Sequence, residues 1–217
     1  MTSDAVAVAP TLELETPHGP ARAHLHPAPR PRAGMVLGHG AGGSVTARDL
    51  VAVTRVAREA GISVALLEQP YRVAGRRSSP PAHHLDRAWL AAVEQLRAGL
   101  LGDLPLVVGG RSAGARVACR TAAESGATAV LCLAFPLQPP PTKFNAAPAS
   151  RLIELDGVEL PTLVVQGAGD RFGLPPPGPT RKVIIVAGDH RLTRDLDAVT
   201  DAVGDWLPEA LGLAGAG

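Results

Sequence analysis

Short, unbroken apolar segments recur along most of the chain. They are residues 34–38, 62–68, 105–110, 127–135, 161–167 and 182–188. Continuous apolar runs of this length are typical of parallel strands that are covered by helices on both faces. Between them lie stretches with apolar residues at helical spacing, at about 46–60, 83–100, 112–125 and 192–211. This alternation predicts an α/β fold with a doubly wound, mostly parallel sheet.

The N-terminal part has a different pattern. Residues 11–16 and 21–26 alternate apolar and polar positions on either side of the turn sequence PHGP. This pattern predicts an antiparallel hairpin at the edge of the sheet. Two proline-rich segments, 135–148 and 172–179, follow predicted strands and are expected to form loops on one rim. In open α/β sheets, ligands bind at the rim formed by the carboxyl ends of the strands.

Length and composition limit the function classes. A chain of 217 residues predicts a single domain over residues 1–217, with a core at about 20–210. Apolar residues make up 46% and charged residues 19%, and the formal net charge is +1. This balance is typical of a globular enzyme and gives no electrostatic reason to expect nucleic acid or a membrane surface as a partner. The oligomeric state is not predicted.

The N-terminal sequence lacks the basic residues and the long apolar stretch of a signal peptide. No segment approaches the roughly 20 apolar residues that a membrane-spanning helix needs. We therefore expect a cytoplasmic protein. Cys119 and Cys132 lie in apolar segments and are expected to be reduced core thiols, with a disulfide or a reactive thiol as the alternatives.

The sequence GRSAG, residues 110–114, matches the G-x-S-x-G pattern of a nucleophile elbow. In such an elbow the serine lies on a tight turn between a strand and a helix, and the flanking glycines let the two elements approach closely. The short pattern also arises by chance, but here it falls between a predicted strand and a predicted helix. Ser112 is therefore the candidate nucleophile.

A serine hydroxyl needs a base to attack an acyl carbon at neutral pH, and in this fold the base follows the nucleophile in the chain. His190 is the only histidine after Ser112, and it comes directly after the last predicted strand. A histidine at the start of a helix can also be purely structural. The combination of its uniqueness and its position favours His190 as the base.

The acid that orients the base is expected at the end of the preceding strand. Asp170 fits this position, because residues 161–167 form a buried strand that runs into the turn containing it. Asp156 and Glu159 precede that strand and would lie at its opposite end. Asp189 is adjacent to His190 and is interpreted as a helix N-cap or a local hydrogen-bond partner.

The glycine-rich segment GHGAGGS, residues 38–44, is predicted to supply part of an oxyanion hole. One donor is the amide of Ala113, after the nucleophile, and the second comes from this loop. The Ala41 amide is the first choice for it, with Gly40 and Gly42 as alternatives. His39 is expected to brace the loop rather than act as a base.

The same loop also fits a dinucleotide-binding pattern. Gly38, Gly40 and Gly43 satisfy G-x-G-x-x-G, and Glu68 ends the next predicted strand, where a ribose-binding acid would lie. This alternative leaves the serine, aspartate and histidine positions unexplained.

Candidate substrate-binding residues lie on the predicted rim. They are Gly40, Gly42, Tyr71, Arg72, Phe135 and Phe172. Arg72, Arg76 and Arg77 are interpreted either as partners for a carboxylate or phosphate of the substrate or as a solvated loop. Phe135, Phe144 and Phe172 are interpreted either as walls of an acyl pocket or as packing within the loops.

With these residues in place, the chain resembles the α/β-hydrolase superfamily, specifically its small dienelactone-hydrolase-like branch with the KANL/Tex-type hydrolases. The resemblance covers about residues 20–210 and rests on the motifs LGHGAGG, EQPYRVAGRRSSPP, GGRSAGARVA, FPLQPPP and LVVQGAGDRFG. It implies an α/β-hydrolase fold with little or no lid and a catalytic triad of Ser112, Asp170 and His190. Arg171 stands where the family often has proline, which leaves the shape of the pocket open.

We therefore expect a serine hydrolase, similar to a carboxylesterase, that cleaves a small carboxylic ester or a related acyl compound through an acyl-enzyme. Its partner would be a small acyl substrate, and the mechanism needs neither a metal nor an organic cofactor. The alternatives are a non-catalytic binding protein with the hydrolase fold and, less favoured, a dinucleotide-binding oxidoreductase. Acyl transfer to an acceptor other than water would use the same site.

Overall fold

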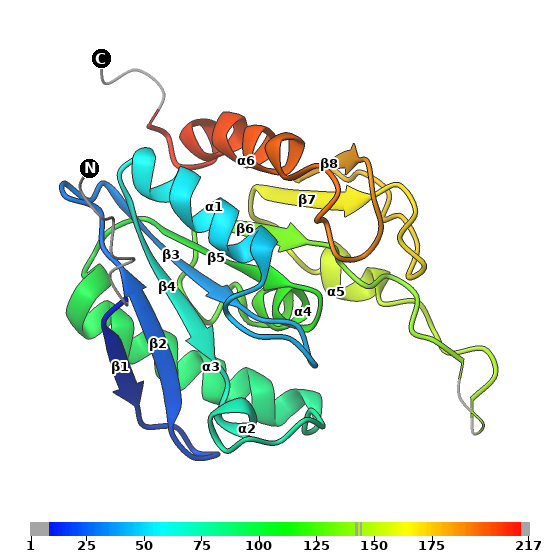
Figure 1. Cartoon of the computed structure of the whole chain (residues 1–217), viewed down its shortest axis with the longest axis horizontal. Coiled ribbons are helices and arrows are strands. Elements are labelled where there is room, and N and C mark those ends of the chain that lie inside the picture. Colours follow the sequence, from blue (N-terminus) through cyan, green and yellow to red (C-terminus); the bar gives the residue numbers. More distant parts are fainter. Residues whose placement is uncertain (1–8, 142, 144, 214–217) are drawn as a thin grey trace, which may run out of the picture.

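A single mixed sheet forms the centre of the computed structural model, which describes residues 9–141, 143 and 145–213 (Figure 1). Its eight strands have the order β1-β2-β4-β3-β5-β6-β7-β8. They are β1 (Thr11–Leu14), β2 (Ala21–His26), β3 (Ala33–Gly38), β4 (Ile62–Glu68), β5 (Leu106–Arg111), β6 (Ala129–Leu133), β7 (Thr162–Gly167) and β8 (Arg181–Val186). The strands from β4 to β8 in this order pair in parallel. The predicted parallel sheet is confirmed.

The predicted hairpin is also confirmed. β1 pairs antiparallel with β2, and β2 pairs antiparallel with β4, so the hairpin forms one edge of the sheet. In the register, Arg22 of β2 lies opposite Glu68 of β4.

Helices cover both faces of the sheet. α1 (Arg48–Glu59) and α6 (Leu196–Ala210) pack against each other on one face, whereas α3 (Ala82–Leu96) and α4 (Ala113–Thr121) pack on the other. Two further helices lie outside the predicted ones: α2 (Pro70–Val73) and α5 (Leu152–Asp156). Each is a single turn, which is too short for apolar periodicity to reveal. The predicted helix 83–100 covers α3 and most of a π-helical segment, Arg97–Leu101, that follows it.

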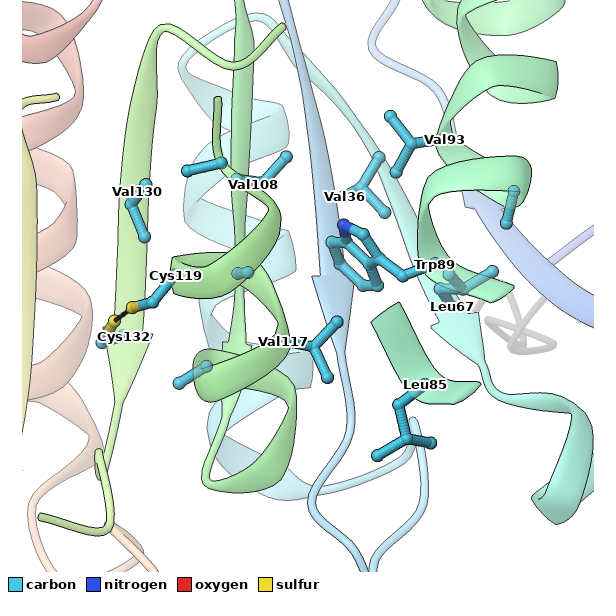
Figure 2. Close-up of a cluster of buried hydrophobic side chains, with 14 of the residues drawn as sticks. Val36, Leu67, Leu85, Trp89, Val93, Val108, Val117, Cys119, Val130 and Cys132 are labelled. Carbon is cyan, nitrogen blue, oxygen red and sulfur yellow. Dashed lines mark hydrogen bonds between the residues drawn. The ribbon is translucent and has the colours of Figure 1, made fainter. Parts of the chain in front are cut away.

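Alternate side chains of the strands contribute to the two core layers. In β3, Met35 and Leu37 pack with the side chains of α1 and α6, whereas Val36 packs on the side of α3 and α4. Figure 2 shows this second layer, in which Trp89 of α3 lies between the strands and the helices and is fully buried. Because both layers are closely filled, the sheet is a rigid support for the loops at its rim.

The two cysteines lie in this second layer. Cys119 of α4 and Cys132 of β6 are buried free thiols whose sulfur atoms are 3.4 Å apart (Figure 2). Burial and the hydrogen bond to Cys119 raise the pKa of Cys132 well above its ordinary value, with the hydrogen bond as the larger cause. The prediction of reduced core thiols is confirmed.

One strand differs from its prediction. β8 was expected to be covered on both faces, but it is the last strand of the sheet, and its Ile185 side chain is 47% exposed. An apolar run does not distinguish an edge strand from a central one, because the neighbouring strand and helices decide how much of it is covered.

The rim of the sheet is open. In Figure 1, the described part of the loop after β6 extends away from the sheet instead of folding over the carboxyl ends of the strands, in agreement with the expected absence of a lid.

Among the helices that the structure describes, none is long and apolar enough to cross a membrane.

Candidate active site

Ser112 lies on a strained turn between β5 and α4. Its backbone angles are φ 53° and ψ −108°, a conformation that residues other than glycine rarely adopt. A Cβ atom at Gly110 or Gly114 would overlap the carbonyl oxygen of Gly38 at the end of β3. The two glycines therefore let the turn pack directly against β3, which presents the serine hydroxyl at the rim, as an elbow requires.

The structure brings the three predicted side chains together. His190 Nε2 is 2.9 Å from Ser112 Oγ, and His190 Nδ1 is 2.7 Å from Asp170 Oδ2. The Asp170 side chain is fully buried, and the His190 side chain is 18% exposed. A carboxylate at Nδ1 favours the tautomer with a proton on that nitrogen, which leaves Nε2 free to accept the serine proton.

Asp170 is held in place by further donors. Gln166 Nε2 donates to Asp170 Oδ2 at 2.8 Å, and the Phe172 amide donates to Asp170 Oδ1 at 2.9 Å. Gln166 Nε2 also lies within hydrogen-bond distance of the carbonyl oxygens of Phe135 and Gly173, so its two N–H bonds are shared among three acceptors. Its side chain is fully buried in β7. Gln166 was not predicted. Its only signal in the sequence is that it is the one polar residue between the apolar run and the glycine of LVVQG.

Arg111 connects the elbow to the histidine loop. Its Nη2 donates to the His190 carbonyl oxygen at 2.8 Å, and its Nε lies 2.9 Å from Asp49 Oδ2 in the first turn of α1. Asp49 is buried, and burial raises the pKa of its carboxyl although the charge of Arg111 opposes this shift. Neither residue was predicted. The sequence offered one signal for this pair: Asp49 is an acidic residue at the start of the predicted helix 46–60.

The glycine-rich loop lies beside the nucleophile. A Cβ atom at Gly40 would be 3.6 Å from Ser112 Cβ and 3.1 Å from Arg111 Nη1, so a small residue is needed there. The amides of Ala41 and Ala113 donate to no other atom of the described residues. Both are therefore available to a substrate oxygen at the rim.

His39 braces this loop, as expected. Its Nε2 accepts a hydrogen bond from the Gln69 amide at 3.1 Å, so Nδ1 carries the proton and donates to the Gly40 carbonyl oxygen at 2.8 Å. Burial is the main cause that lowers the pKa of His39, which keeps the ring neutral. On the other side of the loop, the Tyr71 hydroxyl donates to the Ala41 carbonyl oxygen at 2.7 Å.

The other candidate substrate contacts have different surroundings. The Phe172 ring packs edge to face on the His190 ring, with 4.5 Å between the centroids. Phe135 is fully buried in the core, so the expectation that its side chain contacts substrate is wrong. The residue before it, Ala134, has a positive φ of 49°. Phe144 lies outside the described residues.

Tyr71 and Arg72 are engaged within the protein. Tyr71 is buried and donates its hydroxyl to the glycine-rich loop, and Arg72 Nη1 donates to the carbonyl oxygen of Arg76 at 3.2 Å. Gly42 is exposed, and a Cβ atom there would meet no neighbour within 4 Å.

The structure also bears on the dinucleotide alternative. Glu68 lies within 3.7 Å of Arg22 and 3.6 Å of His24, so its carboxylate faces the hairpin rather than a ribose site. A Cβ atom at Gly38 would be 3.1 Å from the Trp89 ring and 3.2 Å from Gly114, so core packing accounts for this glycine. Among the described residues, no group of three or more His, Cys, Asp or Glu side chains is arranged to hold a metal ion.

Residues 31–195 match the sequence profile of the alpha/beta hydrolase domain family. The chain belongs to this family. A comparison with curated proteins found no significant match. The solved structures with a similar fold include a serine hydrolase without a lid, an esterase domain and a dienelactone hydrolase.

The likeness to these structures extends over nearly the whole chain. The α/β serine hydrolase without a lid from Xanthomonas campestris has a TM-score of 0.73 at 20% identity, covering 94% of this chain and 96% of that one. Est1E from Butyrivibrio proteoclasticus has a TM-score of 0.75 at 16% identity, covering 93% and 99%. The dienelactone hydrolase from Anabaena variabilis has a TM-score of 0.74 at 17% identity, covering 94% and 98%. At these identities the likeness concerns the fold alone.

Proposed function

We propose that this α/β hydrolase is a serine hydrolase that cleaves small carboxylic esters or related acyl compounds, with Ser112 as nucleophile, His190 as base and Asp170 as the acid that orients the base. The observation that carries the proposal is the continuous hydrogen-bonded chain from Ser112 Oγ through the imidazole to Asp170 Oδ2. Its three members come from different loops, so a structural role alone gives no reason for them to meet at one open rim.

In the first half of the reaction, Ser112 Oγ attacks the ester carbonyl carbon, and its proton passes to His190 Nε2. The Asp170 carboxylate stabilises the resulting imidazolium through Nδ1. The tetrahedral intermediate collapses when the C–O bond to the alcohol breaks, and His190 returns the proton to the departing oxygen. The products of this half are an acyl-enzyme on Ser112 and a free alcohol.

In the second half, a water molecule replaces the alcohol. His190 Nε2 accepts a proton from the water as its oxygen attacks the acyl carbon, and the proton then returns to Ser112 Oγ as the carboxylic acid leaves. In both halves the amides of Ala113 and Ala41 stabilise the oxyanion, and each donor contributes about 3 kcal/mol to transition-state binding. Phe172 packs against the His190 ring and supports its position.

A fluorophosphonate probe tests the nucleophile directly. We expect the probe to add its mass to the peptide that contains Ser112, and Ser112→Ala to abolish labelling. Ser78→Ala is the matched control, because Ser78 is exposed on the loop after α2. Labelling of another residue, or labelling that persists in Ser112→Ala, would refute the assignment.

The substrate class is tested by a series of p-nitrophenyl esters from acetate to decanoate, measured beside lactones and thioesters. The open rim favours short acyl groups, so kcat/KM is expected to be highest for the short esters. Adding alcohols or thiols to the assay and analysing the products separates hydrolysis from acyl transfer. A chain that reacts with neither probe nor ester would instead be a binding protein with this fold.

A further inference from the structure

A cavity lies away from the triad. Its volume is about 470 Å³, and it is formed by the β1–β2 turn, α2 and the first turns of α3. Figure 1 shows this turn next to α2. None of Ser112, Asp170 and His190 is among the described residues that line it. Cavities that bind small molecules have volumes of about 300–1,000 Å³, so this one has the size of a ligand site.

The wall of the cavity that faces the nucleophile elbow separates the cavity from the triad. Gln69 and Tyr71 line the cavity, and both are also bonded to the oxyanion loop: the Gln69 amide donates to His39 Nε2, and the Tyr71 hydroxyl donates to the Ala41 carbonyl oxygen. A void of only about 10 Å³ lies between this wall and Ala113. The cavity is therefore behind the loop rather than an extension of the space above Ser112.

Apart from the Tyr71 phenol, the titratable groups of the cavity are basic. Arg76, His18 and His84 line it, and none of the described lining residues carries a carboxylate. The rings of His18 and His84 are stacked with 4.0 Å between their centroids. Desolvation, followed by the charges of His18, His83 and Arg87, lowers the pKa of His84. These groups lack a negative partner within the cavity.

Two polar atoms of the lining residues have no partner. His18 Nε2 and Gln69 Oε1 are buried and make no hydrogen bond with any described residue. A buried polar atom without a hydrogen bond is costly, and such atoms in native proteins call for an explanation. An imidazole nitrogen beside a cavity with a guanidinium group is suited to donate to a bound anion.

Beside the polar Gln69 and Tyr71, the lining has apolar residues, with Pro20, Pro70, Val73, Leu85 and Ala88 among them. We propose that this cavity binds a small organic monocarboxylate, whose apolar body packs on Val73 and Leu85 and whose carboxylate pairs with Arg76 and the stacked histidines. One guanidinium and two imidazoles match a single negative charge, and the apolar residues exclude a ligand that is polar throughout.

The test measures binding of benzoate to the Ser112→Ala protein by titration calorimetry at pH 7. Because this variant lacks the proposed nucleophile, the measurement does not depend on turnover, and its failure would leave the proposed hydrolase function intact. We expect saturable binding with a Kd of about 1 mM or tighter, and binding of the neutral analogue benzyl alcohol about tenfold weaker.

Matched variants locate the site. Arg76→Ala is expected to weaken benzoate binding by about tenfold, which corresponds to the loss of one charge-assisted contact. Arg77→Ala is its control, because Arg77 is the next residue and is exposed but does not line the cavity. His84→Ala and His83→Ala form a second pair of the same design, since only His84 lines the cavity.

Three results would overturn the proposal. One is the absence of saturable binding up to about 20 mM benzoate, a range that includes any affinity of millimolar strength. Another is equal binding by the Arg76→Ala and Arg77→Ala proteins, which would place the benzoate elsewhere, for example at the oxyanion hole. The third is benzyl alcohol binding as tightly as benzoate, which would exclude recognition of the carboxylate.

Discussion

Gln166 donates a hydrogen bond to Oδ2 of Asp170, the same oxygen that accepts the hydrogen bond from His190 Nδ1. The amide thus helps to fix the rotation of the carboxylate that bonds to the imidazole. Since Gln166 does not touch the reacting atoms, it is a positioning residue. Its bonds to the Phe135 and Gly173 carbonyl oxygens in turn fix the Gln166 side chain.

Gln166→Leu is expected to lower kcat for a p-nitrophenyl ester by about tenfold with little change in KM, because the carboxylate loses a donor that aligns it. The buried carbonyl oxygens also lose their donor, so the free energy of unfolding should fall by about 1–3 kcal/mol. Gln138→Leu, on the exposed part of the loop after β6, is the control. Full kcat in Gln166→Leu would show that Asp170 does not need this bond.

Arg111 is predicted to act on both stability and activity. Arg111→Met removes the bond to the His190 carbonyl oxygen and leaves Asp49 as an unpaired buried carboxylate. Breaking a buried ion pair in this way costs about 3–5 kcal/mol. The exposed pair Arg55–Glu59 is the comparison, and Arg55→Met should cost no more than about 0.5 kcal/mol in urea unfolding.

The two effects of Arg111 separate in a double variant. Asp49→Asn combined with Arg111→Met removes the unpaired charge, so most of the lost stability should return. The bond to the His190 loop is still missing, and kcat should stay low. If kcat recovers together with stability, Arg111 has only a structural role.

The contacts of Gln166 and Arg111 also show where sequence reasoning ends. The strands were predicted because continuous apolar runs follow directly from burial on two faces, and Ser112, Asp170 and His190 were predicted because their fold requires a fixed chain order. No such rule predicts the roles of Gln166 and Arg111. Their roles depend on which carbonyl oxygens and carboxylates the folded chain brings next to them, and these partners are distant in the sequence.

Phe135 was misplaced for a related reason. Its position after a predicted strand suggested a rim loop, but its side chain is buried in the core, after an alanine with a positive φ. A positive φ at an alanine is set by tertiary packing, and nothing in the local sequence indicates it. Tyr71 similarly supports the glycine-rich loop through its hydroxyl.

The packing of the elbow predicts a strong effect at Gly114. Its Cβ in Gly114→Ala would overlap the carbonyl oxygen of Gly38, and both atoms are held by backbone elements. We expect a loss of about 2–3 kcal/mol in the free energy of unfolding, since β3 and α4 must separate to relieve the overlap. Gly99→Ala is the matched control, because a Cβ there meets no neighbour within 4 Å. Equal stability of the two variants would mean that the elbow is not closely packed on β3.

His39 predicts how stability depends on pH. Burial lowers the pKa of His39 below its ordinary value of 6.5, so between that value and the lowered one the unfolded chain binds the proton and the folded chain does not. Stability from this residue is therefore complete above about pH 6.5 and falls as the pH drops through this window, by at most about 1.4 kcal/mol per pH unit. Protonation also converts Nε2 into a donor, which breaks its bond from the Gln69 amide.

His39→Gln isolates this effect. The glutamine side chain can accept from the Gln69 amide and donate to the Gly40 carbonyl oxygen, but it does not titrate. The other histidines are common to both proteins, so their contributions cancel in the comparison. Urea unfolding at pH 7.5 and at pH 5.5 should show a larger loss of stability in the wild type than in His39→Gln. Equal losses would mean that His39 does not resist protonation in the folded protein, and the fixed tautomer that holds the oxyanion loop would have to be abandoned.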